Sequence, residues 1–398
     1  MTRRFIHELR LTNLLSFGPD TKPLTLQPLN VLIGPNGAGK SNLLEAISLL
    51  RAAPTNLSIP VKETGVKDWL WKGKKNPTAT IEAVIENSEK EEMPLRHSFS
   101  FIEHGQRFEI TAEKIENKQG YGIHATPYYY YKNEGGFIQL HEKDREDGSE
   151  MNESDKKRTL QRENINPEES ILSQVKDPER YPYLTYLNEQ YRKIQLYREW
   201  SFGRYTAPRQ PQKADASSLY LSEMGENLPL VLNALRPHVK DKLIESLGKL
   251  YPGIDDFNVQ IIGGWVQLFL EEGKFSIPAT RLSDGTLRFL SLLAILLHPE
   301  PAPLVCIEEP ELGLHPDVLP TVVELLVDAS ERTQLIVTTH SEIIIDALTS
   351  RPESVIVCER RNGQTQMQRL NPDELKEWLQ QYRLGELWTK GELGGVRF

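Results

Sequence analysis

Residues 34–41, GPNGAGKS, have the composition and spacing of a loop that cradles phosphate groups. Its glycines allow a tight turn whose backbone N–H groups point inward, and the helix that follows adds a partial positive charge. At this spacing Lys40 reaches the β and γ phosphates of a nucleotide, and the hydroxyl of Ser41 binds Mg²⁺. The alternative, a glycine-rich turn without a ligand, is disfavoured by the apolar strand before the loop and the amphipathic helix after it. The residues expected at the nucleotide are Gly34, Pro35, Asn36, Gly37, Ala38, Gly39, Lys40, Ser41 and Asn42.

Two adjacent carboxylates follow another apolar stretch. Leu304 to Ile307 predict a buried strand, Glu308 and Glu309 end it, and Pro310 stops it. Paired acids at the end of a parallel strand beside a phosphate loop suit metal-assisted phosphoryl transfer. Because the two side chains point in opposite directions, we assign Glu308 to the Mg²⁺ site and Glu309 to polarising the attacking water. A surface turn of acidic residues is the alternative.

A histidine follows the next predicted strand. The stretch LIVTTHSE ends its apolar run at Thr338 and Thr339, and His340 comes directly after them. An imidazole at this place could contact the γ-phosphate and sense its presence. A single histidine at a strand end is most often structural, but the order of the surrounding elements favours the catalytic role.

A second phosphate-binding element is predicted far along the chain. Within ATRLSDGTLRFLSLL, residues 279–293, a turn of Ser283, Asp284 and Gly285 opens a strongly apolar helix. The N-terminus of such a helix, together with the serine hydroxyl, offers donors to a phosphate. The alternative is an ordinary N-cap, in which Ser283 starts a core helix. The two interpretations are compatible, since a cap also fixes the geometry of the turn.

The order of phosphate loop, serine–glycine turn, acidic strand and strand–histidine resembles that of the ABC-type ATPases. Within them it resembles the soluble branch of SMC, RecF and OLD-like ATPases, catalogued broadly as AAA-family ATPases of ABC type, over residues 1–60 and 255–360. The resemblance implies ATP and Mg²⁺ as cofactors and ATP hydrolysis as the activity. It also implies a homodimer in which Ser283, Asp284 and Gly285 close over the ATP that Lys40 of the opposite subunit holds.

The chain departs from the family pattern at several positions. The usual Leu-Ser-Gly-Gly-Gln signature is Leu-Ser-Asp-Gly-Thr here. The carboxylate of Asp284 must therefore point away from the phosphate, or its charge must be compensated by Arg281 or Arg288. Glu308 replaces the usual aspartate, and the glutamine expected near the first lobe's edge has no match. The loop PELGLHP at 310–316 matches the one that crosses the dimer interface in these relatives. It includes His315, either a partner contact or a helix-start residue.

The elements that must position these residues follow from the apolar patterning. We expect an α/β fold: an ABC-type P-loop ATPase head with a mixed sheet, an antiparallel β subdomain and a compact helical insertion. The expected divisions are an N-terminal lobe at 1–140, a charged excursion and helical insertion at 141–255, and a C-terminal lobe at 256–398. Expected strands lie at 5–11, 23–27, 29–33, 78–86, 96–103, 107–116, 121–132, 258–272, 303–308 and 333–340. Expected helical segments are 41–52, 171–250 (interrupted by a loop at 203–216), 317–330 and stretches from Ser341 and from Asn371, with a hairpin turn at Asn362–Gly363.

The composition limits the class of protein and the cellular compartment that this chain can belong to. The 398 residues carry a net charge of −9, which argues against coating nucleic acid through bulk charge. Two cysteines form no disulfide framework and indicate a reducing, cytoplasmic compartment. The N-terminus lacks a signal-peptide pattern. The longest apolar run, FLSLLAILL, has nine residues and is too short to span a bilayer, so we expect no membrane association.

The middle and the end of the chain bear on partners. Residues 190–214 interleave basic and aromatic side chains. One interpretation of this pattern is DNA binding, and the favoured one is a solvated face with a core-facing aromatic stripe.

The sequence contains no heptad repeat, so we expect no long coiled coil. The roughly 60 residues after His340 are too few for a TOPRIM domain. We therefore expect a separately encoded effector, such as a TOPRIM-like nuclease. Residues 384–398 either dock that effector or pack on their own sheet.

Together these features predict a dimeric, ATP-switched ATPase that regulates a partner effector, a nuclease or a toxin, in DNA repair or anti-phage defence. The ATPase subunit of a membrane transporter is the alternative. A small-molecule kinase is a third class, which would lack the turn at Ser283 and the histidine at position 340.

Overall fold

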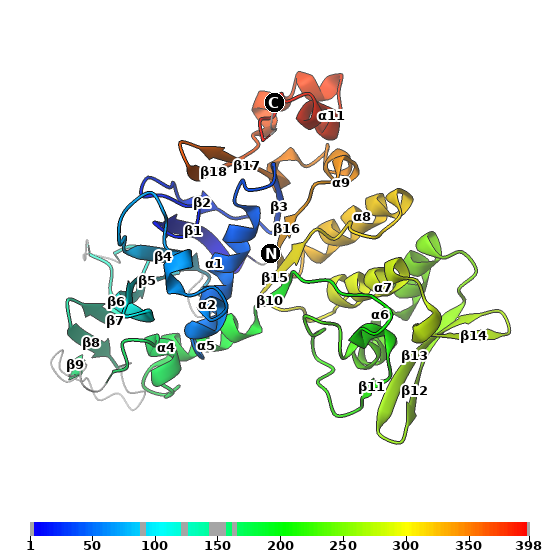
Figure 1. Ribbon diagram of the computed structural model, residues 1–398, viewed down its shortest axis with the longest axis horizontal. Helices are drawn as coiled ribbons and strands as arrows, with labels where there is room; N and C mark the ends of the chain where they lie inside the picture. Colours follow the sequence, from blue (N-terminus) through cyan, green and yellow to red (C-terminus); the bar gives the residue numbers. More distant parts are fainter. Residues whose placement is uncertain (1–3, 88–92, 121–125, 143–156, 161–164, 396–398) are drawn as a thin grey trace.

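The strands of the described residues form three β-sheets (Figure 1). The computed structural model describes residues 4–87, 93–120, 126–142, 157–160 and 165–395. The sheet that positions the candidate site has the strand order β10-β15-β16-β3-β17-β18. These strands are β3 (Leu29–Ile33), β10 (Gln195–Tyr197), β15 (Leu304–Glu308), β16 (Gln334–Thr338), β17 (Val355–Arg361) and β18 (Gln364–Arg369). All are parallel except β18, which runs antiparallel to β17, so segments from both ends of the chain build one sheet.

Apolar residues on alternate positions of these strands enter two different hydrophobic cores. Leu32 and Cys306 pack into one core, and their neighbours Val31 and Ile307 pack into the other. A parallel strand that is buried on both faces has this near-continuous apolar sequence. Because the parallel strands end at one edge, the residues that follow β3, β15 and β16 meet there.

The first core joins this sheet to a large antiparallel sheet with the order β2-β1-β4-β5-β6-β7-β8-β9. Helix α1 (Lys40–Ala52), which follows the phosphate loop, buries Leu43 and Leu44 in the same core. The antiparallel subdomain predicted from the sequence is therefore confirmed. Its strands are β1 (Ile6–Thr12), β2 (Leu24–Thr25), β4 (Ala79–Ile85), β5 (Leu95–His104), β6 (Arg107–Asn117), β7 (Tyr129–Glu134), β8 (Phe137–His141) and β9 (Lys157–Leu160).

The second core contains α7 (Asp284–Leu296), α8 (Leu319–Ala329) and part of α6 (Leu228–Leu250). A small sheet packs on α6, at the opposite end of the molecule from β7 and β8 in Figure 1. It consists of β11 (Gln212–Lys213), β12 (Asp256–Ile262), β13 (Trp265–Glu272) and β14 (Phe275–Pro278). The described residues also form the α-helices α2 (Ser58–Val61), α3 (Val66–Trp69), α4 (Ile171–Gln174), α5 (Pro182–Lys193), α9 (Glu342–Ala347), α10 (Pro372–Leu375) and α11 (Leu384–Thr389). Their 3₁₀ turns include η2 (Ala207–Arg209), η3 (Ala279–Arg281), η4 (Pro316–Val318), η5 (Pro352–Ser354) and η6 (Trp378–Gln380).

Two local predictions were wrong. The single strand expected at 258–272 is a hairpin, because Gly263 and Gly264 both adopt positive φ and reverse the chain between β12 and β13. The helical region expected at 171–250 contains strand β10, which pairs with β15 at the edge of the core sheet. A strand of three residues is too short to show a period of two, so periodicity did not separate it from the preceding helix α5.

Part of the charged excursion expected at 141–170 lies outside the described residues, as do residues 121–125 of the strand expected at 121–132. Within the excursion, β9 pairs antiparallel with β8. In the part of the chain that the structure describes, no helix combines the length and the apolar character needed to cross a membrane.

Candidate functional site

The phosphate loop connects β3 to α1, as its sequence context predicts. Gly39 has a φ of +100° and lies against the side chain of Thr365, so a side chain at this position would meet both strain and a clash. The ammonium group of Lys40 donates to the carbonyl oxygens of Gly34 at 2.7 Å and Pro35 at 3.2 Å. These bonds hold a cation at the mouth of the loop, where nucleotide phosphates would bind. Burial lowers the pKa of Lys40, and the nearby carboxylates offset part of this decrease.

Ser41 and Glu308 form the predicted metal-binding end of the site. The Ser41 hydroxyl donates to one carboxylate oxygen of Glu308. The other carboxylate oxygen accepts from Arg198 at 3.2 Å, and the Glu308 backbone carbonyl accepts from the indole of Trp200 at 2.9 Å. A hydroxyl and a carboxylate are hard oxygen donors of the kind Mg²⁺ takes. Among the described residues there is no cluster of three or more acidic, histidine or cysteine side chains that could hold a metal ion.

Glu309 occupies a strained backbone position. Its φ is +45°, in the left-handed region that residues other than glycine rarely adopt. Hydrogen bonds fix the backbone there: the Glu309 amide donates to the Thr338 carbonyl at 3.0 Å, and the Glu309 carbonyl accepts from Arg288 at 3.1 Å and from the Leu312 amide at 3.2 Å. The turn carries its carboxylate to 3.6 Å from the imidazole of His340. The two residues predicted to act on the attacking water and the γ-phosphate therefore lie side by side.

Glu311 was not predicted as a site residue. One of its carboxylate oxygens accepts from the Thr339 hydroxyl at 2.7 Å and from the His340 amide at 2.8 Å, so it holds the loop after β16. Its other carboxylate oxygen is buried without a hydrogen-bond partner. Burial and the charge of Lys40 lower the pKa of His340, against the opposing effect of Glu309 and Glu311. An acid two positions after Glu309 was the only available signal in the sequence.

Ser283 is the N-cap of α7, and its hydroxyl accepts from the Thr286 amide at 3.0 Å. The side chain of Asp284 is 63% exposed, and its charge is compensated by Arg209. Neither Arg281 nor Arg288 provides this compensation, which corrects the sequence-based expectation. Arg209 also donates to the Leu282 carbonyl. Arg209 reaches the serine–glycine turn because the loop before β11 folds back over that turn. The spacing of these residues in the sequence does not reveal this contact.

The N-terminus of α7 opens into a hollow of about 530 Å³. A Cβ at Gly285 would lie 2.7 Å from the Gly313 carbonyl, so the glycine lets the 310–316 loop approach the turn. The described residues that line the hollow include none from the phosphate loop. They are Leu250, Tyr251, Ile277, Arg281, Leu282, Ser283, Gly285, Thr286, Gly313 and His315.

The basic and aromatic stretch at 190–214 contributes to the site itself. Arg198 binds the Glu308 carboxylate, and Arg209 binds the Leu282 carbonyl and Asp284 in the serine–glycine turn. Arg192 donates to the Pro54 carbonyl at 2.9 Å. The rings of Trp200 and Phe202 stack at 5.8 Å between their centroids. Tyr191, Tyr197 and Phe202 are buried, as the core-facing interpretation expects, but Tyr205 is exposed. Arg209 is buried too, which that interpretation, with its basic residues on a solvated face, did not expect.

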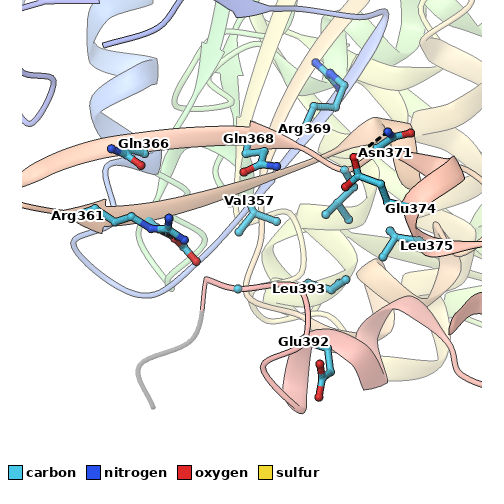
Figure 2. Close-up of a pocket in the computed structure, with 13 residues that line it drawn as sticks. Val357, Arg361, Gln366, Gln368, Arg369, Asn371, Glu374, Leu375, Glu392 and Leu393 are labelled. Atoms are coloured by element: carbon cyan, nitrogen blue, oxygen red, sulfur yellow. Dashed lines mark hydrogen bonds and ion pairs between the residues drawn. The ribbon is translucent and has the colours of Figure 1, made fainter. Parts of the chain in front are cut away.

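The C-terminal segment packs on its own domain over the residues that the structure describes. The Gly385 amide donates to Asp346 on α9 at 2.7 Å, and the Gly395 amide donates to Glu359 on β17 at 2.7 Å. Figure 2 shows the gap that remains between the β17–β18 hairpin and the chain near Leu393, a cavity of about 330 Å³. The segment therefore lies beside the helix that follows His340.

A phosphate loop and an acidic strand next to a strand–histidine, all on one mixed sheet, together with a capped serine–glycine turn at the start of α7, define an ABC-type P-loop ATPase head. Residues 29–346 match the family model described as "AAA domain, putative AbiEii toxin, Type IV TA system", and the chain belongs to this family. The predicted membership in the ABC-type AAA ATPases of the SMC/RecF-like branch is thereby confirmed.

The solved structures support the same fold. The chain matches the Smc head domain with an extended coiled coil bound to the C-terminal domain of ScpA from Pyrococcus furiosus, with a TM-score of 0.56, 14% identity and coverage of 94% of this chain and 98% of that one. It also matches the SmcHead bound to the C-winged helix domain of ScpA, with a TM-score of 0.54, 15% identity and coverage of 93% and 99%. At such identities the likeness establishes the fold alone. No curated protein matches the chain.

Proposed function

We propose that this protein is an ATP-hydrolysing switch that dimerises around ATP. Each nucleotide is held by the phosphate loop of one subunit and is completed by the Ser283 turn of the other. The observation that supports this most strongly is the hollow at the α7 N-terminus, because its lining includes the turn but no described residue of the phosphate loop. A second subunit that brings its own loop to this hollow would join the two phosphate-binding elements.

The chain's own side chains supply the groups that phosphoryl transfer to water needs. Lys40 and the loop amides bind the phosphates, and Asn36, Gly37, Ala38 and Asn42 line the rest of the predicted nucleotide contact. Mg²⁺, when held by Ser41 and Glu308, neutralises charge on the phosphates. Glu309 accepts a hydrogen bond from the attacking water and orients it.

His340 and the opposite subunit complete the proposed mechanism. The lowered pKa leaves its imidazole neutral near pH 7, so it can donate one hydrogen bond to the γ-phosphate while it remains close to Glu309. The Ser283 hydroxyl and the α7 N-terminus of the partner subunit donate to the other side of that phosphate. Because these donors come from two chains, ATP binding and dimer formation are linked.

We further propose that the dimer controls a separately encoded effector, a nuclease or a toxin, in DNA repair or anti-phage defence. The family description names a toxin of a toxin–antitoxin system, and a related Smc head is bound to a domain of another protein. DNA contact through 190–214 would depend on the residues of that stretch that remain exposed, such as Tyr205 at 84%. The two free, buried thiols suit the cytoplasm. A transporter ATPase subunit is the alternative.

The test is the mass of the protein in solution. Glu309→Gln with ATP and Mg²⁺ should give a stable dimer by light scattering, since ATP binds but is not consumed. Adding Ser283→Arg to that variant should return it to a monomer that still binds ATP. A Glu309→Gln variant that stays monomeric with saturating ATP would count against the sandwich. Co-purification with membrane proteins would favour the transporter.

A further inference from the structure

The guanidinium group of Arg198 lies at the metal-binding end of the site. Arg198 directly follows β10, and β10 is the parallel neighbour of β15, so both strands end at the same edge. Its side chain lies between Glu45 of α1, at 2.8 Å, and Glu308, at 3.2 Å. The Arg198 and Glu308 side chains are 26% and 18% exposed, which reduces screening of the pair by solvent.

Both carboxylate oxygens of Glu308 are engaged within the chain. Ser41 donates to one oxygen and Arg198 to the other. Mg²⁺ bound at this carboxylate would therefore share it with a fixed positive charge. Repulsion between two positive charges this close together weakens the binding of each to the carboxylate. Of the two side chains that donate to the Glu308 carboxylate, only Arg198 carries a charge.

The position of Arg198 is built into the fold. Two residues further on, the Trp200 indole donates to the Glu308 carbonyl, and its ring is stacked with that of Phe202. The guanidinium of Arg288, which holds the Glu309 carbonyl, lies 4.9 Å from the Trp200 ring centroid. The backbone after Arg198 is thus fixed against both acids, and a substitution at position 198 removes the charge without releasing the segment.

We propose that Arg198 is a positioning residue that acts as the resident counter-ion of Glu308 and competes with Mg²⁺ for that carboxylate. It thereby sets the Mg²⁺ concentration at which ATP binds tightly. The proposal rests on the proposed function only in requiring that ATP binds at the Lys40 loop. Arg198 holds Glu308 in place when no Mg²⁺ is present and raises the Mg²⁺ concentration needed to load the site.

The experiment measures binding of a fluorescent ATP analogue during Mg²⁺ titration, beside the same measurement in EDTA. Arg198→Gln should lower the Mg²⁺ midpoint by roughly three- to tenfold, the fold-change expected from a partly buried ion pair. Binding in EDTA should be unchanged. Arg198→Lys, which keeps the charge, and Arg192→Gln, a control in the same region that contacts Pro54 instead, should both resemble the wild type.

Glu308→Gln supplies a second, independent check. In that background Arg198→Gln should shift the Mg²⁺ midpoint by less than it does in the wild type, because the carboxylate for which the two cations compete is absent and only their direct repulsion remains. An unchanged or raised midpoint in the single variant, or weaker binding in EDTA, would overturn the proposal while leaving the proposed function intact. If the wild type bound no more analogue than Lys40→Ala under any condition, both the proposed function and this proposal would be wrong.

Discussion

The hydroxyl of Ser41 donates to the carboxylate of Glu308 across 267 positions of the sequence. This bond joins the first residue after the phosphate-loop lysine to the end of the acidic strand, and it forms because β3 and β15 end at the same edge of one sheet. The two halves of the chain therefore bring the phosphate loop and the acidic strand to one place. The Ser283 turn opens into a separate hollow whose described lining has no residue of the phosphate loop, and in the proposed dimer a second subunit brings its own loop there.

Backbone strain at Glu309 can be separated from the chemistry of its carboxylate. Glu309→Gly should raise the free energy of unfolding by up to about 1 kcal/mol relative to Glu309→Ala, because glycine adopts the +45° φ without strain. Both variants should lose ATP turnover by about a hundredfold or more. Urea denaturation and a phosphate-release assay measure the two effects.

The control for that prediction is Gln106→Gly, since Gln106 also has a positive φ, +67°, in the turn between β5 and β6. It should gain stability and keep full turnover. A Glu309→Gly variant no more stable than Glu309→Ala would show that the strain at position 309 is not a cost to the fold.

Glu311 is predicted to position His340. Glu311→Ala removes the oxygen that accepts from the Thr339 hydroxyl and the His340 amide. Turnover should fall by roughly tenfold while ATP affinity stays within about twofold of the wild type. Glu324→Ala, on an exposed face of α8, is the matched control and should change neither value. Loss of ATP affinity equal to the loss of turnover would contradict a positioning role.

His340 contributes to the pH dependence of stability. Its pKa lies below the ordinary value of 6.5, mainly through burial, so the unfolded chain binds this proton more readily than the folded one. The stability that the neutral imidazole contributes is complete above about pH 6.5 and is lost as the pH falls below it. His340→Gln should therefore lose less stability than the wild type between about pH 7 and 5, measured by urea denaturation at each pH. Parallel pH profiles for the two proteins would refute this assignment.

How far the sequence anticipated this site depends on how local each signal is. The loop at 34–41, the paired acids and Ser283 were predictable, because each lies in one contiguous segment with a characteristic flanking element. Arg198 and Arg209 were noticed as members of a basic stretch at 190–214, but their partners were not.

The reason is sequence separation. Arg198 meets Glu308 across 110 positions and Arg209 meets Asp284 across 75, and such contacts are determined by how the strands are ordered in the sheet. The strand that places Arg198, β10, has only three residues and leaves no periodic pattern. Glu311 was missed because its role depends on the neighbouring strand β16, which lies beside it only in the folded sheet.

The most direct measurement of the composite site is complementation between two inactive variants. Lys40→Ala should abolish ATP binding in its own half-site, and Ser283→Arg should block the hollow it offers to its partner. In a mixed dimer one site combines both defects and the other is intact. Because ATP drives dimer formation in this account, only mixed dimers hold ATP in an intact site, and an equimolar mixture should regain up to about half of wild-type ATP turnover, one working site of two per dimer. If the mixture stays as inactive as its components, although light scattering shows that it dimerises with ATP, ATP is not shared between subunits in the way proposed.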